Sequence, residues 1–166
     1  MIVALVVVAD RATKWLVTAN MQRGDTIPVV PGLFSLTYVR NPGAAFGMLA
    51  ESPLRIPVLA LFALAAIGGL TYLLVQTPRT QIWERTAAAV IIGGALGNLY
   101  DRFRYGWVVD FLDFYVQRWH WPAFNIADSC ITVGVAVLLI ASMLRREGDV
   151  PPSSRQEDFD ARQKAV

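Results

Sequence analysis

The sequence predicts an all-α membrane protein with four transmembrane helices, a small β-rich element on the membrane surface and an amphipathic segment in the interface. Of its 166 residues, 55% are hydrophobic and only 17% are charged, and the mean hydropathy is +0.43. Soluble domains contain about 45–50% apolar and about 25% charged residues. The apolar residues form four long runs, which we expect to span the bilayer at residues 2–18, 54–75, 86–102 and 124–144.

The first apolar run, residues 2–18, contains charged residues in its interior. It is as short as the core of a signal peptide, but no positively charged segment precedes it and no small-x-small cleavage site is evident after it. Asp10 and Lys14 are one helical turn apart with the acid first, an order that favours an ion pair. We therefore expect a spanning helix in which Asp10 faces protein and the pair holds helices together.

Residues 20–50 have a different pattern, which predicts a β-rich element. The segments 26–30 and 33–39 are short and rich in β-branched and aromatic residues, and the turn dipeptide Pro31-Gly32 joins them. We expect a hairpin or small sheet on the membrane surface. The NPGAAF loop that follows begins with Asn41, whose amide can both donate and accept hydrogen bonds.

The second and third apolar runs predict transmembrane helices. Residues 54–75 match the ~20 residues that a bilayer helix needs, and their one charge, Arg55, is at the edge. In the third run, residues 86–102, small residues recur every four positions: Ala89, Gly93 and Gly97. This spacing is typical of a face that packs closely against another helix.

The third run ends in three polar residues that lie three and four positions apart, and therefore roughly on one face: Asn98, Asp101 and Arg102. Because Arg102 follows Asp101 directly, we expect these two to form an ionised structural cluster.

Residues 103–123 are dense in aromatic side chains, which gather at the boundary between membrane and water. Residues 111–121, FLDFYVQRWHW, are expected to lie in the interface as an amphipathic segment or to line a site there. Asp113, one helical turn beyond Asp110, is expected to face solvent. His120, the one histidine, is flanked by tryptophans and is expected to be an interfacial anchor rather than a general base.

The fourth run begins with a capping signal. Asn125 is placed to cap the helix, which puts Asp128 in the first turn, where the helix dipole favours an anion. The polar tail, residues 146–166, contains prolines and mixed charge and is expected to be disordered. The arginine count at the two ends of the spans does not decide the orientation, although a disordered tail fits the cytoplasm better.

Four carboxylates gather where apolar runs end: Asp101, Asp110, Asp113 and Asp128. Charge at the edge of hydrocarbon is costly, so the cluster indicates function. Two close carboxylates that share one proton can hydrolyse a peptide bond, one activating water and the other holding the proton. The apolar neighbours of Asp110 would raise its pKa and suit the proton-holding role. The helix start suits Asp128 to the role of base.

Two other classes of function compete with this interpretation. A Ser129 or Cys130 nucleophile would need a base, for which Lys14 and His120 are the candidates, and no spacing brings either close. A small transporter would place charges near the middle of the membrane. The net charge of +2 is too small to indicate nucleic-acid binding. A single cysteine excludes an internal disulfide and a cysteine zinc site, and we expect no metal and no cofactor.

Five blocks of the sequence occur in a characteristic order: DRATK (10–14), NPGAAF (41–46), GGALGNLYDR (93–102), VVDF (108–111) and FNIADS (124–129). This series resembles the motifs of the lipoprotein signal peptidases, the signal peptidase II family, from residue 10 to about 135. Any one block alone is a weak signal, but the ordered series is highly specific. One departure is Arg11, where the family usually has glutamine.

The resemblance implies an aspartic endopeptidase of the bacterial inner membrane, with four spanning helices, an extracytoplasmic β-rich cradle and an extracytoplasmic site. It implies a diacylglyceryl-modified prolipoprotein substrate, cut before the lipidated cysteine, and Asp110 and Asp128 as the catalytic pair. The implied substrate-binding residues are Asn41, Asn98, Arg102 and Asn125, and the implied supporting residues are Asp10, Lys14, Gly43, Asp101 and Ala127. We expect residues 1–145 to form one domain that acts as a monomer in the phospholipid bilayer.

Overall fold

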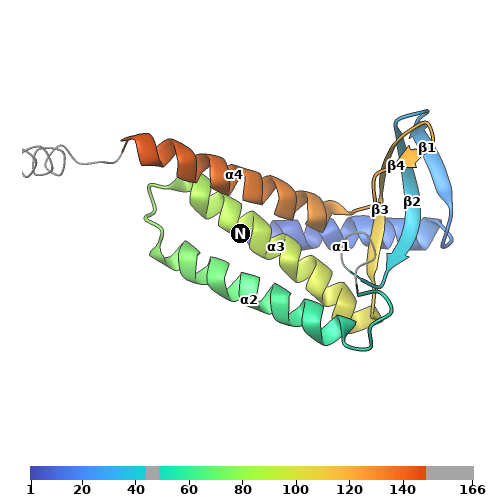
Figure 1. The fold of residues 1–166 in the computed structure, drawn as a ribbon, viewed down its shortest axis with the longest axis horizontal. Coiled ribbons are helices and arrows are strands. Elements are labelled where there is room, and N and C mark those ends of the chain that lie inside the picture. The colour runs from blue at the N-terminus through green and yellow to red at the C-terminus, as the bar shows by residue number, and fades with distance from the viewer. Residues whose placement is uncertain (44–48, 149–166) are drawn as a thin grey trace, which may run out of the picture.

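A computed structural model describes residues 1–43 and 49–148 of the chain, which form four long helices with a small sheet at one end (Figure 1). The helices are α1 (Ile2–Asn20), α2 (Arg55–Gln76), α3 (Ile82–Tyr105) and α4 (Ile126–Gly148). The strands are β1 (Thr26–Val30), β2 (Phe34–Asn41), β3 (Val108–Val116) and β4 (Trp119–His120). The sheet is antiparallel, with the order β1-β2-β3-β4.

Each predicted span corresponds to one helix, with shifted ends. The third helix begins four residues before the predicted residue 86, and α4 continues to Gly148, into the predicted tail. The remaining tail, 149–166, and part of the NPGAAF loop, 44–48, lie outside the described residues. Among the described residues, two helices are long and apolar enough to cross a membrane, namely α2 and residues 126–144 of α4.

Helix α3 is the central element of the bundle, because it contacts each of the other three helices. Its predicted small-residue face makes the close approach that the spacing indicates. A Cβ added at Gly93 would lie 2.7 Å from Val6 Cβ of α1, and one at Gly97 would lie 2.6 Å from Asp10 Oδ2. These glycines let α1 and α3 approach closely enough for Asp10 to lie against Gly97 of α3.

The sheet is fixed to the bundle by a hydrophobic core on α1. Val17 and Met21, at the end of α1, pack with Tyr38 of β2 and with Val109 and Phe111 of β3. These side chains are at most 9% exposed. The two central strands are therefore held against the helix that carries Asp10 and Lys14.

Most of the expected amphipathic segment, residues 111–121, belongs to β3 and β4, so the helical spacing assumed for it is wrong. Valine, phenylalanine and tyrosine in β3 favour strands, and β3 pairs with β2 so that Val39 lies opposite Asp110. The chain is consequently not all-α.

The prediction that Asp113 faces solvent is also wrong. Successive side chains of a strand alternate between its faces, so Asp113, three positions along, cannot share the face of Asp110. Asp113 is buried, at 7% exposed, and its carboxylate lies 3.0 Å from His120 Nδ1. The His120 ring also stacks on Tyr115.

The close contact at Gly97 gives a stability prediction. Gly97→Ala should lower the free energy of unfolding by roughly 1–3 kcal/mol, because the new methyl group overpacks against Asp10. Thermal unfolding of the detergent-purified protein measures the change. Gly68→Ala in α2 is the control, since a Cβ there meets no atom within 4 Å. Equal unfolding temperatures for the two variants would contradict the proposed close packing.

Candidate active site

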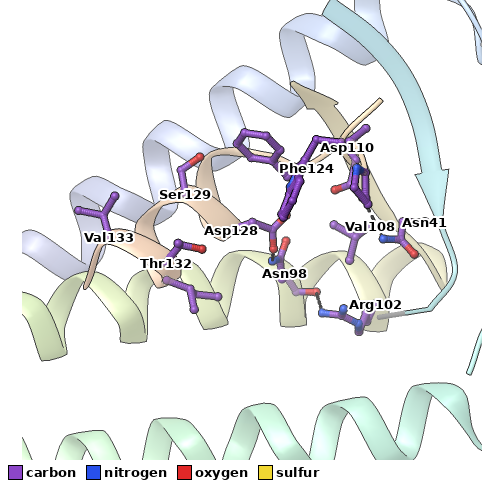
Figure 2. Close-up of a pocket in the computed structure, with 14 residues that line it drawn as sticks. Asn41, Asn98, Arg102, Val108, Asp110, Phe124, Asp128, Ser129, Thr132 and Val133 are labelled. Carbon is purple, nitrogen blue, oxygen red and sulfur yellow. Dashed lines mark hydrogen bonds between the residues drawn. The ribbon is translucent and has the colours of Figure 1, made fainter. Parts of the chain in front are cut away.

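A cavity of about 550 Å³, which we call the main cavity, lies between the sheet and the ends of α3 and α4 that are nearest to it (Figure 2). Its lining contains five of the six residues predicted to be catalytic or substrate-binding: Asn41, Asn98, Arg102, Asp110 and Asp128. The sixth, Asn125, is completely buried beside them. Residues from β2, α3, β3 and α4, far apart in the sequence, therefore meet at one place.

Asp110 is held by two amide groups. Its side chain is nearly buried, and Asn41 Nδ2 donates a hydrogen bond of 3.0 Å to Asp110 Oδ2. The antiparallel register places Asn41 opposite Val108, two positions from Asp110 and on the same face of the sheet, so the two side chains are diagonal neighbours. Asn125 Nδ2 donates the second bond, 2.7 Å long, to Asp110 Oδ1.

Asp128 is held by the start of α4. The predicted cap is confirmed, because Asp128 N donates to Asn125 Oδ1 over 3.0 Å, and Asn125 N donates back to Asp128 Oδ2 over 3.2 Å. Such a reciprocal arrangement satisfies two backbone donors that the helix leaves unpaired. Phe124, just before the cap, exchanges backbone hydrogen bonds with Leu112 of β3. This bridge places the start of α4 beside the strand that carries Asp110.

Asn98 connects Asp128 to a buried lysine. Its Nδ2 donates to Asp128 Oδ1 over 2.7 Å (Figure 2), while its Oδ1 accepts from Lys14 Nζ over 3.0 Å and from Asn125 Nδ2 over 3.2 Å. Because the oxygen already faces two donors, only the nitrogen of this amide can face the carboxylate. Lys14 therefore sets the orientation in which Asn98 holds Asp128.

The predicted pair of Asp10 and Lys14 is confirmed, with a separation of 2.9 Å between Asp10 Oδ2 and Lys14 Nζ and almost no exposure. The other oxygen of Asp10 accepts a hydrogen bond of 3.1 Å from the backbone N–H of Ala127. One carboxylate thus joins α1 to the first turn of α4. This is the contact for which Gly97 leaves space.

The predicted cluster of Asp101 with Arg102 is wrong. Asp101 pairs instead with Arg11 and with Lys14, whose Nζ lies 2.9 Å from Asp101 Oδ2. Neighbouring residues on a helix point in different directions, about 100° apart. Arg102 consequently lines the main cavity, and its guanidinium donates to the carbonyl oxygens of Asn98 and Gly43 at 3.3 and 3.4 Å.

Burial raises the pKa of Asp110 to about 7, and the nearby charge of Asp128 acts in the same direction. The hydrogen bonds from Asn41 and Asn125 oppose this shift, as does the charge of Lys14. The raised pKa expected for Asp110 is therefore confirmed. At neutral pH a proton can reside on this carboxyl, so that the pair can both give and take a proton.

The serine and the two candidate bases of the alternative nucleophilic mechanism have other partners. The Ser129 hydroxyl donates to the Asn125 carbonyl over 2.9 Å. Of the two candidate bases, Lys14 is paired with carboxylates and His120 with Asp113. Within residues 1–43 and 49–148, no three histidine, cysteine or acidic side chains are grouped as a metal site would require.

The main cavity is completed by apolar residues to which the sequence analysis assigned no catalytic or binding role, among them Val108, Trp121, Phe124, Ile131 and Val133. For Trp121 the prediction that the aromatic segment lines a site is confirmed. The alternating β-branched and aromatic residues of β3 were the available signal for Val108, because they indicate a strand.

The model of the family described as signal peptidase (SPase) II matches residues 2–144 of the chain. The chain belongs to the signal peptidase II family. Two relatives, both named lipoprotein signal peptidase, come from Syntrophotalea carbinolica and Geobacter sulfurreducens. The first is 46% identical over 141 residues, or 85% of this chain and 88% of the relative. The second is 48% identical over 140 residues, or 84% and 87%.

Solved structures agree with the assignment to signal peptidase II. A bacterial membrane enzyme solved at 2.3 Å resolution superposes with a TM-score of 0.81 at 31% identity, covering 90% of each chain. A second, solved at 1.9 Å, gives a TM-score of 0.74 at 33% identity, covering 84% of this chain and 88% of that one. This peptidase therefore shares its fold with these two bacterial membrane enzymes.

The environment of Asp110 in this signal peptidase II predicts how its carboxyl titrates. Asp128→Asn should lower the pKa of Asp110 below about 7, because it removes a repelling charge. Asn41→Ala should raise it, because it removes a hydrogen bond that stabilises the charged form. Carboxyl NMR of ¹³C-labelled aspartate measures both midpoints.

Asp113→Asn is the control for these titrations, since Asp113 contacts His120 and not Asp110. It should leave the midpoint of Asp110 unchanged. Movement of the Asn41→Ala and Asp128→Asn midpoints in the same direction would contradict the described hydrogen bond.

Proposed function

We propose that this chain removes the signal peptide from diacylglyceryl-modified prolipoproteins by cutting the peptide bond before the lipidated cysteine. One observation carries the proposal. Asp110 and Asp128, both held by buried amides, line one cavity in a chain of the signal peptidase II family. The raised pKa of Asp110 supports a pair in which one carboxyl is protonated.

In the proposed reaction Asp128 is the base and Asp110 holds the proton. Asp128 takes a proton from a water molecule, whose oxygen attacks the scissile carbonyl carbon. Asp110 gives its proton to the carbonyl oxygen, which yields a neutral tetrahedral diol. When the diol collapses, the carbon–nitrogen bond breaks. The cysteine nitrogen receives the proton that Asp128 had taken, and a diol hydroxyl returns its proton to Asp110.

Polar residues around the pair are proposed to hold the peptide. Asn41 and Asn98 line the main cavity and carry amides that can meet a substrate backbone. Arg102 also lines the cavity, and its donors suit carbonyl oxygens of the lipid ester or of the backbone. Asn125 is completely buried, so we assign it to positioning the two carboxyls rather than to direct substrate contact.

The apolar lining is proposed to receive the lipid. Ile131 and Val133 extend the main cavity along α4, and Val133 is 59% exposed on the outer face of that helix. An acyl chain that lies against α4 could thus remain in the membrane while the lipidated cysteine reaches the carboxyls. Phe124 and Trp121 would cover the cavity on the side of the sheet.

We further propose that all four helices span the bacterial inner membrane and that the sheet and main cavity lie at its extracytoplasmic face. The apolar lengths of α2 and α4 support two spans. Helices α1 and α3 pack along these two helices. The ion pair of Asp10 with Lys14 is buried, so the two charges on α1 would not face lipid. Residues 1–145 would then act as one integral-membrane unit, which we propose to be a monomer.

Asp110→Asn and Asp128→Asn should each reduce cleavage of a diacylglyceryl-modified lipobox peptide by at least about a thousandfold, because neither amide can replace its carboxyl in proton transfer. The double variant should be scarcely slower than either single one. Rates with purified, folded protein measure this.

Asp113→Asn is the matched control, since it makes the same change on the other face of the same strand and should retain most activity. Near wild-type cleavage by Asp110→Asn would reject the assignment of the pair. If Asp101→Asn lost activity while Asp110→Asn kept it, the pair would have been assigned to the wrong aspartate.

The proposed orientation can be tested with two matched cysteines in a Cys130→Ser background. Arg23→Cys, beside the sheet, should react with a membrane-impermeant reagent added to intact spheroplasts. Arg79→Cys, in the exposed turn between α2 and α3 at the opposite end (Figure 1), should react only after the membrane is permeabilised. The reverse pattern, or labelling of both from outside, would refute the orientation.

A further inference from the structure

A second cavity, of about 180 Å³, lies behind the main cavity, and we call it the arginine cavity. Its lining residues are Arg11, Lys14, Thr18, Tyr38, Arg40, Tyr105, Trp107 and Val109. The volume is several times the roughly 30 Å³ of one water molecule, which leaves room for a small tetrahedral anion. None of the residues implied to be catalytic or substrate-binding lines it.

The two cavities lie on opposite faces of the same strands. In β3, Val108 and Asp110 line the main cavity while Val109 lines the arginine cavity. In β2, Asn41 lines the first and Arg40 the second. This alternation is the ordinary alternation of side chains along a strand, so the arginine cavity is a separate place and not an extension of the first.

The lining of the arginine cavity is cationic. It contains Arg11, Lys14 and Arg40 but no carboxylate. Asp10 and Asp101 lie behind the lining and pair with Lys14, while Arg11 also pairs with Asp101. These two carboxylates balance two of the three cations, so one positive charge remains, and it belongs to Arg40.

Arg40 is held in place without an acidic partner among the described residues. Its Nε donates to the Tyr38 hydroxyl over 3.0 Å, and its guanidinium lies 4.8 Å from the centre of the Trp107 ring and 5.5 Å from that of Tyr38. A guanidinium held by aromatic rings keeps its terminal N–H groups for an acceptor. In the part of the chain that the structure describes, no hydrogen bond occupies those terminal groups.

We propose that the arginine cavity binds one phosphate-type anion, the phosphodiester of an anionic phospholipid headgroup. Arginine forks match phosphate oxygens in two-point hydrogen bonds. Tyr105 and Trp107 are residues of the kind that gather at the membrane–water boundary, where headgroups lie. The choice of a lipid rather than free phosphate rests on the proposed membrane placement, whereas the anion site itself rests on the lining.

Binding is tested with the delipidated full-length protein in a neutral detergent, by native mass spectrometry. The probes are phosphatidylglycerol, a diacylglycerol with the same acyl chains, and inorganic phosphate. Phosphatidylglycerol should bind, and Arg40→Gln should weaken it at least about tenfold, because a charge-assisted contact is lost. Arg40→Lys, which keeps the charge but loses the fork, should bind with intermediate affinity and serves if the glutamine variant does not fold.

Arg118→Gln is the matched control, because Arg118 is exposed in the turn between β3 and β4 and does not line the cavity. It should bind phosphatidylglycerol like the wild type. Equal affinity of wild type and both Arg40 variants for phosphatidylglycerol and phosphate would overturn the proposal. Arg40-dependent binding of inorganic phosphate without binding of phosphatidylglycerol would retain the anion site and reject the lipid.

The same measurement separates this proposal from the proposed peptidase function. Asp110→Asn should lose cleavage but bind phosphatidylglycerol with unchanged affinity, since Asp110 does not line the arginine cavity. Conversely, Arg40→Gln protein that has lost lipid binding still carries both carboxyls in the main cavity. A failed lipid result therefore leaves the peptidase assignment intact, and a failed cleavage result leaves the anion site intact.

Discussion

The arrangement of the site depends on one buried amide, that of Asn125. Its nitrogen lies 2.7 Å from Asp110 Oδ1 and 3.2 Å from Asn98 Oδ1, and its oxygen caps α4 at Asp128. A buried amide without partners would cost about 1–3 kcal/mol, so these contacts must form together. Because the partners come from three elements, the start of α4, the end of α3 and β3 are fixed relative to one another by a single side chain.

Around this amide, buried charge is balanced within the protein rather than by solvent. Lys14 contacts Asp10 and Asp101 at 2.9 Å each, and Arg11 also pairs with Asp101. Removing one partner of such a group leaves an uncompensated buried charge, which is strongly destabilising. The glycine at position 97 makes the arrangement sterically feasible. The charged side chains of α1 thus form ion pairs inside the bundle, and these pairs stabilise the site at the end of the bundle nearest the sheet.

Much of this could be predicted from the sequence, because the decisive signals are local. The pair of Asp10 with Lys14 follows from a four-residue spacing, and the cap at Asn125 from its place before an apolar run. The partner of Asp101 could not be predicted in this way, since Arg11 lies on another helix and the adjacent Arg102 suggested a false pairing. The position of Asp113 was missed because strand alternation, rather than helical spacing, governs residues 108–116.

The exposure of Val133 beside the main cavity has a kinetic consequence. With α4 placed in the bilayer as proposed, a cavity whose wall continues onto the outer face of that helix would be reached by diffusion within the plane of the membrane. The relevant substrate concentration is then molecules per unit of membrane area, and not molecules per volume of water. Adding inert lipid would slow encounters by dilution in two dimensions even when the total amounts of enzyme and substrate stay constant. Saturation would accordingly be described by a mole fraction in the membrane.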